Sequence, residues 1–236
     1  MATIAYDAYL EVLPFGETLA QVPELPGCYA KGASESEAVN RLYIAVPDYY
    51  RWLRMQDEET PTMSGDVEIM VRERVPVTRN ALHEIRAFFA TDDEPLSVDD
   101  LDWGLALMSY AHQDFTRQLR NVDDAVLEWQ PDSESWSIRQ IIDHVAQQEA
   151  WLARRLDEPP TVPLITALPG PPLERLNRIH ERSMVRLSQS TPEQREVVRD
   201  INGERWSLRK IVRRSIVHER EHTDQVAIVL ARYASR

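Results

Sequence analysis

Residues 136–142 read WSIRQII, and the same pattern returns at residues 206–212 as WSLRKIV. In both copies a serine directly precedes an apolar segment with helical spacing, and a serine at that place typically caps the first turn of a helix. Gln140, three residues after Ser137, completes a capping box in the first copy. The repeat therefore predicts the origins of two helices, at Ser137 and at Ser207, from which positions along each helix can be counted.

Two further helices are predicted from apolar residues that lie three and four positions apart. One begins at Ser97 and the other follows Pro172, while the helix from the second repeat runs to about Tyr233. Four helices that occupy most of the chain after residue 97 predict a four-helix bundle. The proline-rich segment 157–172, between the second and third helices, is expected to be a stiff and ordered crossing.

The first 75 residues have short alternating segments, which are typical of strands. The predicted strands lie at residues 8–13, 18–22, 28–31 and 67–72. A helix is expected from a capping box at Ser34 to about residue 53, and Pro47 should kink or divide it. These elements predict a small sheet with one helix across it.

The fold class that follows is α+β with two domains. The predicted boundaries are an α/β domain at 1–75, a linker at 76–96 and a helical bundle at 97–236.

Composition and charge exclude several classes of protein. The chain has 236 residues, of which 43% are hydrophobic, so a packed core is expected. The formal net charge of −12 disfavours a nucleic-acid partner, since such binding needs a basic surface. Cys28 is the single cysteine, which excludes an internal disulfide and a thiolate zinc cluster. With no apolar run near 18 residues and no signal-peptide pattern, we expect a cytoplasmic protein without a membrane partner.

Two histidines on the last predicted helix have the spacing of metal ligands. His218 and His222 are four residues apart, so both rings project from one face and can reach a single ion. Together with Gln225 they continue the apolar, core-facing stripe of that helix. Buried polar side chains are costly unless they find partners, and a bound metal would satisfy all three. A buried hydrogen-bond network of the same side chains is the alternative.

His144 is the candidate for a third ligand. It lies about 10 Å into its helix, while His218 and His222 lie about 16 and 22 Å into theirs, at 1.5 Å per residue. If the two helices are antiparallel with their ends level, His144 stands between the other two histidines. Three imidazoles would then leave coordination positions open for water or substrate, as a catalytic metal site requires.

Several residues are candidates for supporting roles around these ligands. Glu149 and Asp143 flank His144 and are candidate acceptors for its second N–H group. Arg214, four residues before His218 on the same face, is a candidate for binding a substrate carboxylate.

The remaining histidines are assigned to structural or surface positions. We expect His112, on the core side of the first bundle helix, to be a core histidine with satisfied hydrogen bonds, and His83 and His180 to be surface residues. Glu219 directly follows His218, so a zincin-like hydrolase with Glu219 as its base is a rival hypothesis. In a helix, however, Glu219 is turned about 100° from His218 and away from the open site.

Residues 136–145, followed by His218, His222 and Gln225, resemble the DinB-like (YfiT-like) helical bundle superfamily, over about residues 95–236. The resemblance implies an up-down-down-up four-helix bundle, usually dimeric, with a divalent metal, often zinc or nickel, held by three histidines. These would be His144, His218 and His222. Members include thiol S-transferases that use bacillithiol or mycothiol and a maleylpyruvate isomerase. The resemblance thus implies a metal-dependent enzyme that acts on a small-molecule substrate, with a low-molecular-weight thiol as a candidate second cofactor.

The N-terminal part resembles the HicB-like antitoxin fold over roughly residues 5–75, through the turn PELPGC at 23–28, Gly32 and the helix start at Ser34. HicB antitoxins pair with a small ribonuclease toxin and usually carry a DNA-binding tail. Here a helical bundle takes the place of that tail and the chain is acidic, so we expect a reused interaction or capping module. The alternative to an enzyme is therefore a non-catalytic module that recognises a protein partner through its HicB-like part.

Overall fold

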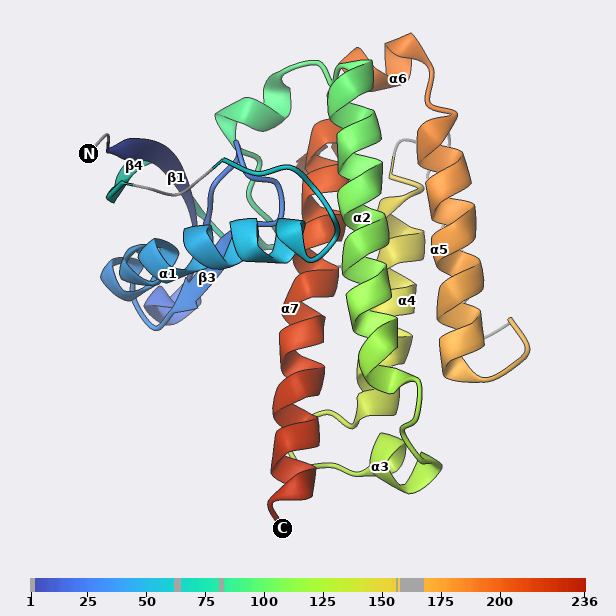
Figure 1. Ribbon diagram of the computed structural model, residues 1–236. Helices are drawn as coiled ribbons and strands as arrows, with labels where there is room; N and C mark the ends of the chain where they lie inside the picture. The colour runs from blue at the N-terminus through green and yellow to red at the C-terminus, as the bar shows by residue number, and fades with distance from the viewer. Residues whose placement is uncertain (1–2, 62–64, 81–82, 156, 158–167) are drawn as a thin grey trace. The chain divides into compact units, whose positions relative to one another are not determined.

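The computed structural model describes residues 3–61, 65–80, 83–155, 157 and 168–236. The chain is mixed α+β, with an N-terminal sheet followed by helices, as predicted (Figure 1). Contacts group it into two compact units: Met1–Pro95 with Val198–Ser207, and Leu96–Val197 with Leu208–Arg236. The domain boundaries at residues 75 and 97 stay a prediction. Within the described ranges, no helix has both the length and the apolar character needed to cross a membrane.

The first unit contains a four-stranded sheet in the order β3-β2-β1-β4, in which β1 is antiparallel to β2 and parallel to β4. The strands are β1 (Ile4–Val12), β2 (Thr18–Gln21), β3 (Tyr29–Gly32) and β4 (Val67–Pro76). All four predicted strands are present, and β1 and β4 are longer than predicted. A short 3-10 turn, η1 (Pro14–Gly16), joins β1 to β2.

Helix α1 (Glu35–Arg54) packs on this sheet through its apolar face. Its start is capped by Ser34, which accepts from the Glu37 backbone N–H as predicted, whereas the Glu37 carboxylate accepts from the Ala33 N–H, one residue before the position that a capping box requires. The prediction that Pro47 divides the helix is wrong, because α1 continues through it as one element. Buried residues on both sides of Pro47, among them Val46 and Tyr49, hold the helix on the sheet and offset the hydrogen bond that proline cannot donate.

The rest of the first unit consists of short elements. They are β5 (Thr78–Arg79), β6 (Glu84–Ile85), η2 (Ala90–Asp93), β7 (Arg199–Ile201) and β8 (Glu204–Trp206). Glu204 of β8 contacts the segment around β6. Its buried carboxylate accepts from the Arg86 N–H at 3.2 Å and contacts His83 Nε2 at 2.7 Å. The second repeat therefore begins inside a β-hairpin, where Trp206 is buried, rather than in a simple loop.

The second unit is helical. Its long helices are α2 (Val98–Leu119), α4 (Ile138–Leu152), α5 (Pro172–Ser188) and α7 (Leu208–Ala234), and its short ones are α3 (Asp124–Glu128) and α6 (Pro192–Glu196). Helix α2 contacts α5 and α7, and α4 contacts the same two helices. An apolar core fills the space between them, including Phe115, Ile138, Ile141, Ile142, Val145, Leu176, Ile179 and Val226.

The predicted helix starts are confirmed at their caps. Ser97 accepts from the Asp100 N–H, and Ser137 forms the predicted capping box with Gln140. Helix α4 ends at Leu152, one turn earlier than the end near residue 156 assumed from the sequence. Most of the predicted stiff crossing at 157–172 lies outside the described residues. In Figure 1, α7 ends at the same end of the helical unit where α4 begins, so these two helices run in opposite directions.

Candidate metal centre

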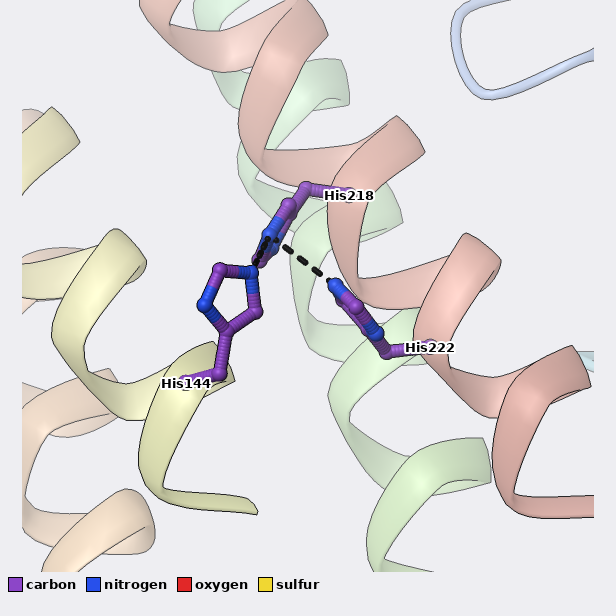
Figure 2. Close-up of side chains that lie close together, drawn as sticks. All are labelled: His144, His218 and His222. Carbon is purple, nitrogen blue, oxygen red and sulfur yellow. Dashed lines mark hydrogen bonds between the residues drawn. The ribbon is translucent and has the colours of Figure 1, made fainter. Parts of the chain in front are cut away.

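Three histidines from two antiparallel helices converge in the second unit. His144 projects from α4, and His218 and His222 project from α7 (Figure 2). The Nε2 atom of His218 lies 3.0 Å from Nε2 of His144 and 3.1 Å from Nε2 of His222. The ring of His144 is 5.0 Å from that of His218 and 4.9 Å from that of His222, between centroids. His144 is therefore about equally far from the other two rings, whose own centroids are 4.4 Å apart.

The three Nε2 atoms fit a divalent ion. In a tetrahedral site with metal–nitrogen bonds of 2.0–2.1 Å, neighbouring ligand nitrogens are roughly 3.3 Å apart. The two Nε2 distances from His218 are within a few tenths of an ångström of that spacing, so an ion needs only a small outward movement of the rings. His218 is buried while His144 and His222 are half-buried, which leaves one side of the cluster accessible.

The surroundings favour, for two of these rings, the state that a metal requires, which is a neutral imidazole with its lone pair directed inward. Burial, and to a lesser degree the proximity of His222, lower the pKa of His144 to about 4, so this ring is neutral at pH 7. Gln225 Oε1 accepts a hydrogen bond from His222 Nδ1 at 2.7 Å. Because Nδ1 then carries the proton, the lone pair of His222 is on Nε2, which faces the cluster.

Trp136 covers part of the histidine cluster. Its ring lies 4.8 Å from the ring of His144 and stacks near-parallel to that of His222, at 6.3 Å and 14°. Trp136 is 40% exposed, so it forms an edge of the site that solvent and small molecules can reach. The position of Trp136 over the cluster was not predicted from the sequence.

The residues predicted to support the three histidines have other contacts in the structure. Glu149 is buried and contacts His180 Nδ1 at 2.9 Å, while Asp143 pairs with Arg175. Both carboxylates thus have partners other than the second N–H of His144. Arg214 is buried at 6% exposure in the first half of α7.

A second histidine cluster lies in the same unit and was missed by the sequence reasoning. His112, His180 and Glu219 have donor atoms within 4.8 Å of one another. The prediction of a surface position for His180 is wrong, because this side chain is 8% exposed. It lies four residues after Leu176, on the buried face of α5, and that spacing was the available signal. His83, also expected at the surface, is half-buried against Glu204.

His112 is the satisfied core histidine that was predicted. Its Nδ1 lies 2.8 Å from Glu219 Oε1 and its Nε2 lies 3.0 Å from Asn177 Oδ1. Burial alone would lower the pKa of His112, but the hydrogen bond and charge of Glu219 outweigh it and raise the pKa. Burial raises the pKa of Glu219, and His112 opposes that shift. Glu219 is therefore directed into the second cluster rather than exposed.

A small cavity adjoins both clusters. The volume of this cavity is about 10 Å³, which is room for about one water molecule. It is lined by Met108, Val145, Glu149, Leu152, Ser215, His218 and Glu219.

A family model described as the DinB superfamily matches residues 107–226 of this chain. The match covers all three histidines of the candidate metal centre as well as Gln225. No curated protein and no solved structure matches the chain. The comparisons give no support for a HicB-like domain, so the resemblance of residues 5–75 stays a prediction. Since the family model covers half of the sequence, the chain belongs to the DinB superfamily.

Proposed function

We propose that this protein is a divalent-metal-dependent enzyme in which His144, His218 and His222 hold the ion. The observation that carries the proposal is the convergence of three Nε2 atoms, at 3.0 and 3.1 Å from the central one. Membership of a metal-associated superfamily supports it. The proposal includes an up-down-down-up bundle of α2, α4, α5 and α7 and a homodimer, in keeping with the family resemblance.

The chain's own residues prepare this site in three ways. His144 is kept neutral by burial, and Gln225 holds His222 with its Nε2 lone pair inward. Trp136 covers one side of the cluster and gives an entering molecule an aromatic surface to contact. When bound, a divalent ion held by these three neutral imidazoles would keep its full 2+ charge and would lower the pKa of a thiol or water that binds to it.

The reaction that we infer is transfer of a low-molecular-weight thiol, of the bacillithiol or mycothiol type, to a small electrophile. The thiol sulfur forms a bond to the electrophilic carbon, the leaving group departs with its electron pair, and the thiol proton passes to solvent. Zinc or nickel is the ion we propose, because imidazole ligands suit both.

Two alternatives make different use of the same residues. A zincin-like hydrolase needs the carboxylate of Glu219 beside the reacting water, whereas the hydrogen bond to His112 directs it into the buried second cluster. A non-catalytic protein would use the HicB-like part, residues 5–75, to recognise a protein partner, with the helices as a structural scaffold.

The experiment uses untagged full-length protein, purified without a nickel column. We expect about one equivalent of tightly bound zinc or nickel at the three-histidine site, lost in His222→Ala. In the cobalt-substituted protein, a low-molecular-weight thiol should produce a sulfur-to-cobalt charge-transfer band. Metal retained by a His218→Ala, His222→Ala double variant at this site would contradict the proposed centre. If the protein binds cobalt but the added thiol produces no charge-transfer band, the thiol chemistry is contradicted and water is favoured as the ligand.

A further inference from the structure

Four long helices each place one buried titratable side chain in a second polar centre. These are His112 from α2, Glu149 from α4, His180 from α5 and Glu219 from α7, which are 9%, 7%, 8% and 5% exposed. Burying four such groups is costly unless they satisfy one another or a bound ion. The proposed function uses none of them.

The histidines of this centre have their outer nitrogens held by oxygen acceptors. His112 Nε2 lies 3.0 Å from Asn177 Oδ1, and His180 Nδ1 lies 2.9 Å from Glu149 Oε1. A bound ion would displace the proton that His112 Nδ1 donates to Glu219, and the contacts to Asn177 and Glu149 would then hold the lone pairs of His112 Nδ1 and His180 Nε2 inward. This is the outer support that metal-binding imidazoles have in proteins, and it matches the Gln225–His222 contact of the first cluster.

The inner atoms are close enough to be brought together on one ion. His112 Nδ1 lies 2.8 Å from Glu219 Oε1, and one atom each of His112, His180 and Glu219 lies within 4.8 Å of the other two. Two imidazoles and a carboxylate are a common donor set for divalent transition metals.

An unsatisfied oxygen points to a ligand independently of this spacing. Among the residues that the structure describes, no hydrogen-bond partner is found for the buried Oε2 atom of Glu149. Glu149 lines the small cavity together with Glu219 and Ser215. A buried carboxylate oxygen without a partner is expensive, and a cation beside it would remove that cost.

We propose that His112, His180 and Glu219 form a second divalent-cation site, with Glu149 supporting His180 and facing the same ion. Its two carboxylates give it more negative charge than the three-histidine cluster, so we expect it to accept Mn²⁺ or Fe²⁺ as well as Zn²⁺. The rings of His112 and His180 lie parallel, 3.9 Å apart at 2°. Because one ion cannot lie in two parallel ring planes, binding turns one ring and ends the stacking.

The test is the number of Co²⁺ ions bound per chain, measured by equilibrium dialysis of untagged, chelator-treated full-length protein. Wild-type protein should bind two, and His222→Ala and His180→Gln should each bind one. Glu149→Gln, which keeps the shape of the side chain, should weaken the second site by about 10–100-fold. His83→Gln is the matched control, since His83 also contacts a buried glutamate, Glu204, but belongs to the other unit. It should still bind two.

Each result decides the proposal, and circular dichroism checks that the variants are folded. One ion in wild-type protein that disappears in His222→Ala overturns the second site and leaves the proposed function standing. One ion that survives His222→Ala but disappears in His180→Gln supports the second site and overturns the first. Two ions in wild-type protein and still two in folded His180→Gln and Glu149→Gln place the second ion elsewhere and overturn the proposal.

Discussion

Gln225 Oε1 lies 2.7 Å from Nδ1 of His222, one helical turn away on α7, and thereby directs Nε2 of His222 at the other two histidines. Replacing Gln225 with Leu should weaken metal binding by about 10–100-fold, because the ring loses the acceptor that fixes its tautomer and orientation. Gln225→Glu, which keeps an acceptor, should retain most of the affinity. Competition with a chromophoric chelator measures both variants, and an unchanged affinity in Gln225→Leu would refute this role.

Trp136 should report on the metal directly, since its indole contacts the rings of His144 and His222. Adding Co²⁺ to the apo protein should quench part of the tryptophan fluorescence, and Trp136→Phe should remove most of that quenching. Trp206 stands at the same place in the second repeat but is buried in the first unit. Trp206→Phe is therefore the control, and it should retain the quenching by Co²⁺. Equal quenching in Trp136→Phe and wild-type protein would count against the arrangement.

Helices α2 and α7 approach closely at Gly104. A Cβ at this position would lie 2.4 Å from Cγ1 of Val212. We expect Gly104→Ala to destabilise the protein by about 1–2 kcal/mol, since overpacking outweighs the gain in helix propensity. In a Val212→Ala background the same change should be neutral or stabilising, by up to about 1 kcal/mol. Urea denaturation measures this cycle, and a stabilising Gly104→Ala in the wild-type background would contradict the close approach.

Asp100 links the first turn of α2 to Arg209 at the start of α7, with 2.9 Å between Oδ2 and Nη2. Burial acts to raise the pKa of Asp100, but hydrogen bonds from Arg209 and Ser97 outweigh it and lower the pKa. A depressed carboxyl pKa contributes stability above the unfolded value of about 4, and that stability is lost as the pH falls through the folded value.

Asp100→Asn should therefore cost about 0.5 kcal/mol at pH 7, a small value because the carboxylate is 52% exposed. The cost should shrink as the pH falls below about 4. Asp99→Asn removes a charge from the same turn and leaves the Arg209 contact in place, so it should show a smaller pH dependence. Thermal melts between pH 3 and 7 compare the two variants, and identical profiles would show that Arg209 contributes nothing.

Local signals account for the parts of the fold that the sequence predicts. The caps at Ser34, Ser97 and Ser137 act within one helical turn, so they can be recognised without knowledge of the tertiary structure. The three-histidine cluster was also predictable, because His218 and His222 share a helix and His144 needed two further assumptions, that the two helices are antiparallel and that their ends are level.

Features that depend on several distant segments were not predictable. The second polar centre takes side chains from four helices, and single residues such as His112 and His180 carry no signal of that convergence. The prediction that Pro47 would divide α1 was wrong because packing of α1 on the sheet outweighs a local rule. Trp136 and Trp206 stand at the same place in two similar segments, yet one covers the histidines and the other is buried in a hairpin, a difference that depends on tertiary structure.

The convergence of three imidazoles on one ion is tested most directly by diffraction from zinc-loaded crystals, with anomalous differences collected at the zinc absorption edge. A peak is predicted about 2.0–2.1 Å from Nε2 of His144, His218 and His222 together. No peak at this cluster in a fully zinc-loaded crystal, or a peak bound by fewer than two of these rings, would contradict the metal centre.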